Sequence, residues 1–358
     1  MDVNGLAVNN VTLSSEFMPN LEEIYGHCLT LNTLFSFIVT LPTMYIVNAK
    51  TLRHYANCIL NILVWNLILN IFVSSFYRVV PLYPAFCYKN NGILRYFAAN
   101  DAAGFYSIMV LFACYFNITA AIAVLQVFRF LQTVCKKSVE NINVKLGYSC
   151  VVIVHFFATV IAILVCQHTR APPSMYQEIF KYNPYFVEEL SDPTVICFVT
   201  QDVKILNLVC FGITLLIVSA TTGLQFISLK HLEKQKTSLT SQAYNQQRRL
   251  TIHLLAIVLV PILVGGLPFE LQFGTLMFNN SYVQVIAVVL SGIALLHHNI
   301  FCIFVLCLFK SYRFATKALL YKMMQMNPTV TVSSSSGIVE ERRQSAFVNA
   351  AARIDVHI

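Results

Sequence analysis

The residues of this chain that could do chemistry lie singly within long apolar stretches. His155, His253, His297 and His298 are isolated or adjacent imidazoles, and a zinc site would require several such ligands to converge. The sequence contains no HExxH helix, no GxSxG turn, no glycine-rich phosphate loop and no Cys/His catalytic pattern. We therefore expect buried, hydrogen-bonded histidines, no enzyme activity, and no metal or cofactor.

Four asparagines in the second apolar stretch are the other polar group of interest. At 100° per residue, Asn57 and Asn61 share one face of a helix, while Asn66 and Asn70 share the opposite face. This arrangement favours hydrogen bonds to two different neighbouring helices. A polar cluster that rearranges on activation is the alternative interpretation.

The composition is that of a membrane protein. Of the 358 residues, 57% are hydrophobic and only 11% are charged, whereas a soluble domain has about 25% charged residues. Seven stretches that are long enough to span a bilayer lack Lys, Arg, Asp and Glu. Because backbone groups in lipid must bond within helices, this predicts an all-α membrane protein, a GPCR-like bundle of seven transmembrane helices. Within a transmembrane domain of residues 26–310, the expected spans are about 26–48, 56–78, 102–129, 146–167, 204–228, 250–272 and 284–309.

The distribution of basic residues predicts the orientation. With the N-terminus outside and the C-terminus inside, 18 of the 24 Lys and Arg residues lie on the cytoplasmic side, as the positive-inside rule requires. Residues 1–25 then form an extracellular tail with a glycosylation sequon at Asn10. Residues 311–323 suit an amphipathic juxtamembrane helix, and the Ser-rich residues 324–358 suit a disordered cytoplasmic tail. The net charge of +8 therefore faces membrane lipid, and no nucleic-acid partner is expected.

Two of the eleven cysteines lie in predicted outside loops. These are Cys87 and Cys197, and the outside of a cell is oxidising, so a disulfide between them is expected. Cys28 and Cys166 lie near the outer ends of their helices and are alternative partners. The sequence alone leaves the pairing open.

The sixth predicted span contains residues that interrupt a regular helix. Pro261 lies in its middle and has no backbone N–H to donate, so a kink is expected there. Gly265 and Gly266 loosen the same stretch. The kink could be static, or it could act as a hinge that lets the inner end of the helix swing.

Several short motifs occur in an order that is typical of one receptor family. The segment QVFRF at 126–130 resembles the arginine-containing inner end of the third helix in serpentine receptors, although Phe128 stands where an acid usually precedes the arginine. The other similar segments are 61–70, 81–84, 92–94, 246–248 leading to Pro261 and Pro268, and 296–298 leading to 310–313. Over about residues 25–320 the chain resembles the nematode chemosensory receptors of the Str superfamily, especially the Srh and Sri groups. The motifs of rhodopsin-like receptors in the sixth and seventh helices are absent.

This resemblance implies a G-protein-coupled chemosensory receptor of the odorant or pheromone type. Its place would be the plasma membrane, at the cilium of a sensory neuron. Its partners would be a small-molecule or peptide ligand, a heterotrimeric G protein and membrane lipid, and a homo- or hetero-oligomer is compatible with the class. The residues expected at the coupling face are Arg129, Lys136, Lys137, Arg248, Arg249, Tyr312 and Arg313.

A ligand site is expected between the outer halves of the helices, where bundles build cavities. The polar and aromatic residues expected to line it are Asp101, Tyr106, Ser107, Tyr115, Glu270, Gln272, Gln284 and Ser291. Two other functions fit seven helices. A ligand-gated channel with its N-terminus inside is opposed by the distribution of basic residues, and a transporter is opposed by the lack of charge within the spans.

Overall fold

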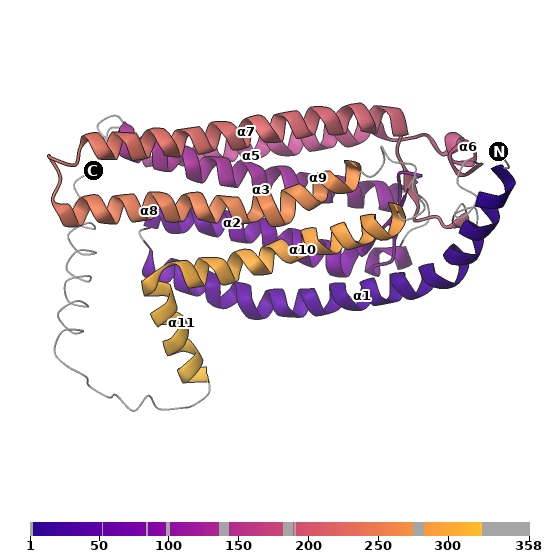
Figure 1. The fold of residues 1–358 in the computed structure, drawn as a ribbon, viewed down its shortest axis with the longest axis horizontal. Helices are drawn as coiled ribbons and strands as arrows, with labels where there is room; N and C mark the ends of the chain where they lie inside the picture. The colour runs from indigo at the N-terminus through magenta and orange to yellow at the C-terminus, as the bar shows by residue number, and fades with distance from the viewer. Residues whose placement is uncertain are drawn as a thin grey trace.

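A computed structural model describes residues 3–51, 53–83, 85–97, 101–135, 143–181, 189, 191–274 and 283–323. Side chains are described from Asn20 onward, except at several positions in 200–210 and at Phe273. Within these ranges seven helical segments are long and apolar enough to cross a membrane, and they lie side by side in an elongated bundle (Figure 1). The helices are α1 (Val3–Lys50), α2 (Arg53–Ile71), α3 (Ala102–Val134), α5 (Val144–Thr169), α7 (Thr200–Lys234), α8 (Ser241–Val260) with α9 (Leu267–Gly274), and α10 (Val283–Leu308). The predicted seven-helix class is confirmed.

Several helices are longer than the sequence predicts, among them those of the first, third, fifth and sixth spans. Helix α1 begins at Val3, so residues 3–25, which were expected to form a tail, are helical and continuous with the first span. Glu22 and Glu23 end the charge-free stretch, yet Tyr25 and Leu21 still belong to an apolar face that packs into the core. Helix α3 likewise runs to Val134 and not to 129. The side chain of Asn10 and the tail 324–358 lie outside the described residues.

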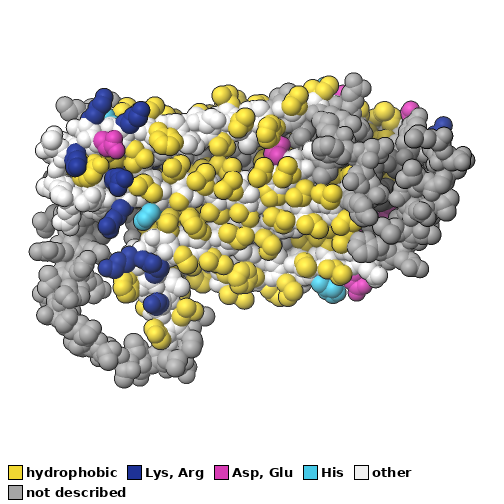
Figure 2. Space-filling view, viewed as in Figure 1, with side chains coloured by type: hydrophobic (Ala, Val, Ile, Leu, Met, Phe, Trp, Pro, Cys, Tyr) yellow, Lys and Arg dark blue, Asp and Glu magenta, His cyan; other side chains and the backbone are white. Residues whose placement is uncertain are grey.

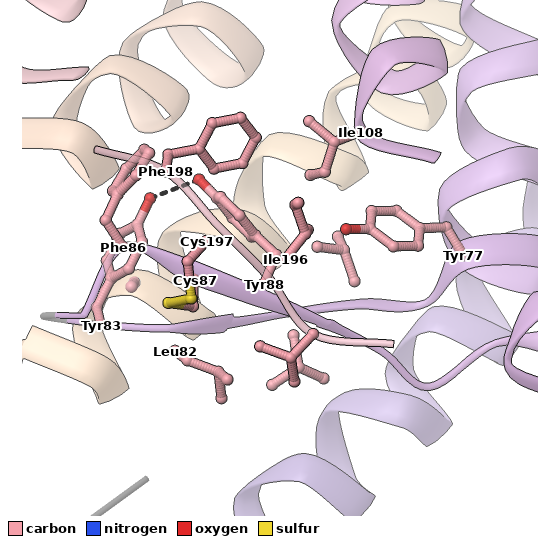
Figure 3. Packing of buried hydrophobic residues seen from close by; sticks show 14 of the residues in the cluster. Tyr77, Leu82, Tyr83, Phe86, Cys87, Tyr88, Ile108, Ile196, Cys197 and Phe198 are labelled. Atoms are coloured by element: carbon pink, nitrogen blue, oxygen red, sulfur yellow. Dashed lines mark hydrogen bonds between the residues drawn. A yellow bond between two sulfur atoms is a disulfide. The ribbon is translucent and has the colours of Figure 1, made fainter. Parts of the chain in front are cut away.

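A small antiparallel sheet closes one end of the bundle, which is called the cap end below. Its strands β1 (Val79–Leu82), β2 (Cys87–Asn90) and β3 (Ile196–Cys197) lie in the order β1-β2-β3. Cys87 is paired with Cys197 in the register, and the two form a disulfide. Figure 3 shows this bridge among the buried aromatic side chains of the cap. The disulfide therefore ties the loop after α2 to the loop before α7.

The chain enters this sheet through a sharp change of direction. A π-helical turn, η1 (Phe72–Tyr77), ends α2, and Arg78 then adopts a left-handed conformation with φ 45°. Gly92 packs beneath the turn so closely that an added Cβ would lie 2.3 Å from the carbonyl oxygen of Phe76. The remaining short elements at the cap end are η2 (Ile93–Phe97), η3 (Pro173–Met175) and α6 (Tyr176–Lys181).

The opposite end carries the helix α11 (Lys310–Met323) and is called the α11 end. Helix α11 turns away from α10 and runs across the bundle axis (Figure 1). Its bounds agree closely with the predicted helix at 311–323. Figure 2 shows an apolar surface along the middle of the molecule, with lysines and arginines gathered toward the α11 end. This is the surface expected of a protein that sits in a bilayer with one basic flank.

Four buried polar residues join α1, α2 and α10 in a closed set of hydrogen bonds, called the polar ring below. The amide of Asn32 donates to Asn70 at 2.8 Å, and Asn70 donates to Ser36 at 2.8 Å. Ser36 donates to Asn299 at 2.9 Å, and Asn299 donates back to Asn32 at 2.6 Å. All four are at most 6% exposed. The ring satisfies polar groups that would otherwise be costly to bury.

Candidate functional site

A cavity of about 330 Å³ lies between the helices beneath the cap. Its walls come from α3, α7, the sixth span and α10, and its end wall comes from Val79, Pro81 and Tyr88 of the sheet. Its size is at the lower end of the range for small-molecule sites. The apolar and aromatic lining includes Leu69, Ile108, Phe112, Ile118, Leu215, Phe269 and Leu295.

Two aromatic rings form the centre of one wall. Tyr115 of α3 stacks on Phe269 of α9, with ring centroids 4.7 Å apart and an interplanar angle of 28°. Phe112 meets the same Phe269 edge-on at 6.2 Å. Tyr115 and Phe112 lie three residues apart, so they share a face of α3 that points at α9. The sequence-based choice of Tyr115 as a lining residue thus agrees with its position.

Three of the predicted polar residues also lie at this cavity. Glu270, Gln272 and Ser291 all contribute to its lining and are 9%, 4% and 8% exposed. The hydroxyl of Ser291 donates to the Ala287 carbonyl within its own helix. The Oε2 atom of Glu270 is buried and has no hydrogen-bond partner among the residues that the structure describes. The cavity is therefore mainly apolar, and Glu270 is the single acid among the described residues of its wall.

A cluster of aromatic residues around the disulfide, called the roof below, backs the end wall of the cavity, and its member Tyr88 lines the cavity itself. Tyr83 and Tyr88 join their hydroxyls at 2.7 Å, and Phe86 and Phe198 pack against Tyr88 edge-on (Figure 3). Burial raises the pKa of both tyrosines well above the ordinary value, so their hydroxyls remain protonated hydrogen-bonding groups. The roof is a packed lid of neutral side chains.

The sheet is attached to the bundle by a residue that was expected to bind ligand. The side chain of Gln284 accepts from the backbone N–H of Tyr83 at 2.6 Å and donates to the carbonyl of Pro81. It does not line the cavity. Gln284 therefore docks β1 onto the start of α10 and lies outside the lining of this cavity.

The predicted residues at the start of α3 also lie away from the cavity. Asp101 pairs with Arg170 at 2.6 Å, and Ser107 is buried and donates to the Ala103 carbonyl within α3. Tyr106 is 63% exposed, so it points out of the bundle. The sequence shows which residues of α3 are polar. Which face of α3 points outward depends on its packing against α5 and α7, and no local sequence pattern specifies that packing.

At the α11 end, Arg129 lies in a buried site between three helices. It is 2% exposed and donates five hydrogen bonds. Its partners are the hydroxyl of Tyr55 on α2 at 3.0 Å, the hydroxyl of Thr251 on α8 at 3.2 and 2.9 Å, and the carbonyl and side-chain oxygens of Gln247 on α8 at 3.0 and 2.8 Å. We call Arg129, Tyr55, Thr251 and Gln247 the arginine clamp. Every acceptor in it is neutral.

The other residues of the predicted coupling face differ in accessibility. Arg248, Arg249 and Arg313 are exposed at the α11 end. Tyr312 is instead buried, at 2% exposure, with its hydroxyl bonded to Thr51 at the end of α1. It fixes α11 to the bundle and is not free to contact a partner. Lys136 and Lys137 lie outside the described residues.

The sixth span links the cavity to the arginine clamp. Between α8 and α9 it adopts a π-helical turn, η5 (Pro261–Gly266), in place of the simple kink expected at Pro261. Such turns are frequent at functional positions in helices. Gly265 lies against the ring of His297 on α10, where an added Cβ would be 2.9 Å from Cγ. The irregular turn thus lets α10 pack directly on the backbone of the sixth span.

Sequence patterns do not single out the partners of Arg129 as functional residues, and of the polar ring they identify only Asn70. Asn32, Ser36 and Asn299 are single polar residues in apolar spans, as are Tyr55 and Thr251. The sequence indicated only that Arg129, if buried, would require several hydrogen-bond acceptors. No spacing rule identifies acceptors on other helices.

Comparison with known proteins agrees with these features. The family model of the serpentine type 7TM GPCR chemoreceptor Srh matches residues 20–322. This range covers all seven spans, the cap and nearly all of α11. No curated protein matches the chain.

Proposed function

We propose that this chain, which belongs to the Srh family of serpentine seven-transmembrane chemoreceptors, binds a small molecule in the cavity beneath the cap and signals through a heterotrimeric G protein. Membership of a chemoreceptor family and seven membrane-spanning helices make it a multi-pass membrane protein of the receptor type. The observation that carries the proposal is that the sixth span takes part in both the cavity and the arginine clamp. It contributes Glu270 to the cavity and Thr251 to the arginine clamp, with the turn η5 between them.

The proposed orientation places the cap outside the cell and α11 inside. Two features support it. The disulfide between Cys87 and Cys197 lies at the cap end, and disulfides persist in oxidising surroundings. Lysines and arginines gather toward the other end (Figure 2), which the positive-inside rule assigns to the cytoplasm. A tag at the N-terminus should be stained on intact cells, and a tag at the C-terminus only after permeabilisation. The reverse staining would contradict this orientation.

In this proposal the described conformation is the resting one. Arg129 is too deeply buried to reach a G protein while Tyr55 and Thr251 hold it. Movement of α8 about η5 would break the bonds to Thr251 and Gln247, release the guanidinium and open a site at the α11 end. A ligand that contacts α9 differently in the two states would shift this equilibrium. The chemosensory role and a ciliary location are the family expectations that go with it.

Loosening the clamp without removing Arg129 provides a test that needs no ligand. The double variant Tyr55→Phe/Thr251→Val removes three hydrogen bonds to the guanidinium. At about 0.6 kcal/mol for each bond within a membrane, the loss is about 2 kcal/mol, which shifts the resting equilibrium about 30-fold. We expect higher ligand-independent nucleotide exchange when membranes containing the variant are mixed with purified heterotrimers of the major classes.

The matched control makes the same two chemical changes elsewhere. Tyr45 is exposed on α1, and Thr33 bonds only to the Leu29 carbonyl of its own helix among the interactions described. Tyr45→Phe/Thr33→Val should therefore leave basal exchange unchanged. If the clamp variant reaches the membrane but stimulates no class of heterotrimer, G-protein coupling through the clamp is contradicted. A ligand-gated current in membranes free of G protein would instead favour the channel.

A further inference from the structure

Among the residues that the structure describes, the wall of the cavity beneath the cap has one carboxylate and no basic side chain except an imidazole. Among its described lining residues, Glu270 is the sole acid, His297 is the sole histidine, and neither Lys nor Arg is present. Glu270 is 9% exposed, and its Oε2 atom has no hydrogen-bond partner within the described part of the chain. A free anion is therefore an unfavourable ligand for this cavity, because Glu270 repels it and no Lys or Arg among the described lining residues would neutralise it.

An unpaired carboxylate in apolar surroundings is energetically unfavourable. Buried charges in proteins are ordinarily paired with an opposite charge and hydrogen-bonded. At the cap end, Arg170 and Lys89 are already paired, with Asp101 and Glu189 respectively. They are therefore not free to neutralise Glu270. The missing partner of Glu270 is best supplied by something that enters the cavity.

The rest of the wall fixes the character of that partner. Phe269 precedes Glu270 on α9 and stacks on Tyr115, and the neighbouring wall is formed by aliphatic side chains of α3 and α10. Leu215 of α7, Leu263 of η5 and Leu267 of α9 line the cavity and are also 45–56% exposed on the outside of the bundle. The cavity therefore reaches the lipid-facing surface between α7 and the sixth span. An apolar ligand suits both the wall and this opening.

We propose that the cavity binds a small apolar amine, whose ammonium group pairs with the carboxylate of Glu270 and whose hydrocarbon part packs on the aromatic and aliphatic wall. This inference rests on the proposed receptor function, because it names the ligand class of the same site. The ammonium group pairs with the carboxylate of Glu270 at the cavity wall, which gives the unpaired acid an opposite charge. The position of Glu270, four residues after η5 ends, lets the ion pair act directly on the sixth span.

Direct binding to the purified receptor tests the ligand class without any G protein. The probes are 2-phenylethylamine, the isosteric 2-phenylethanol, and phenylacetic acid, with n-hexylamine and hexan-1-ol as an aliphatic pair. Ligand-induced thermal stabilisation in one detergent gives the relative affinities, because a ligand that binds only the folded state raises its stability. We expect both amines to bind, the alcohols to bind much more weakly, and the acid not to bind.

Variants connect this preference to Glu270. Removing one partner of a buried charge pair lowers affinity by about 30-fold or more. Glu270→Gln should therefore bind the amines at least about 30-fold more weakly than the wild type does and keep its affinity for the alcohols. Glu178→Gln is the matched control, since it makes the same charge change at an exposed position of α6 at the cap end. It should bind like the wild type. Glu270→Asp keeps the charge and should retain the preference for amines.

Three results would overturn the proposal. They are equal binding of alcohol and amine by the wild-type receptor, unchanged amine binding by Glu270→Gln, and failure of every amine to bind the wild type. The first would indicate that Glu270 is protonated and serves a neutral ligand. None of these results bears on G-protein coupling, which the clamp variant Tyr55→Phe/Thr251→Val tests without ligand. Failure of the receptor function would appear there and leave the binding series intact.

Discussion

Two adjacent glycines in η5 allow the contact between the sixth span and α10 to be measured. A Cβ added at Gly265 would lie 2.9 Å from Cγ of His297, whereas the nearest atom to a Cβ at Gly266 would be at an ordinary 3.8 Å. The His297 ring cannot turn aside freely, because its Nε2 lies 2.6 Å from the Oδ1 of Asn66 on α2. Gly265→Ala must therefore move the ring, the helix or both, while Gly266→Ala needs no movement.

The expected magnitudes follow from two opposing effects. Replacing a helical glycine by alanine stabilises a helix by about 1 kcal/mol, and this gain is common to both variants. Overpacking a close contact costs about 1–3 kcal/mol, and this cost applies only at Gly265. Gly266→Ala should thus be as stable as the wild type or more stable. Gly265→Ala should be about 1–3 kcal/mol less stable than Gly266→Ala.

Thermal denaturation of the two purified variants in the same detergent measures the difference. We expect Gly265→Ala to unfold at a clearly lower temperature than Gly266→Ala. A second replacement, His297→Ala in the Gly265→Ala background, removes the ring that the new methyl group meets and should narrow the gap between the variants. Equal unfolding temperatures for the two single variants would refute the reasoning, because η5 would then have room for a side chain on the α10 side.

Two further predictions concern the cap and the polar ring. Removing the disulfide with Cys87→Ser/Cys197→Ser should lower the free energy of unfolding by about 2–4 kcal/mol and weaken ligand binding. Cys150→Ser, at an exposed free cysteine, should change neither property. Equal melting temperatures for these two variants would contradict the prediction. Asn70→Leu removes hydrogen bonds to Asn32, Ser36 and Ser74, at about 0.6 kcal/mol each. It should melt well below Asn57→Leu, which removes one exposed bond to Tyr148.

The faces of the second span could be predicted from the sequence because helical periodicity alone determines them. Asn61 bonds to His155 of α5 at 2.8 Å, while Asn66 and Asn70 bond to residues of α10 and α1. The two asparagine pairs thus contact different neighbours, as their 100° spacing indicated. The bounds of α11 followed for the same reason, since its amphipathic pattern is local.

The direction of single side chains within the bundle could not be predicted in the same way. Tyr106 and Tyr115 lie on one helix, yet the first is exposed and the second stacks on Phe269. In a lipid environment an apolar or aromatic residue is suitable on either face, so hydrophobicity does not distinguish inside from outside. Gln284 shows the same limit for polar residues, because the strand that it holds lies about 200 residues away along the chain. The directions of the two tyrosines and of Gln284 are therefore set by tertiary contacts and not by local sequence.

Phe128 precedes Arg129 at the position where the resemblance to serpentine receptors leads us to expect an acid. Its ring packs edge-on against Tyr55, with centroids 5.3 Å apart, and Tyr55 accepts a hydrogen bond from Arg129 at 3.0 Å. In place of the expected acid, the ring of Phe128 thus packs on the neutral acceptor that α2 supplies to Arg129. Breaking a buried ion pair leaves an uncompensated charge and costs several kcal/mol, whereas each neutral bond in a membrane is worth about 0.6 kcal/mol. A clamp built from neutral acceptors is therefore easier to open, and the opening depends on α8, which carries the acceptors Thr251 and Gln247. In the proposed mechanism, control of Arg129 therefore lies in the sixth span, whose other end lines the cavity beneath the cap.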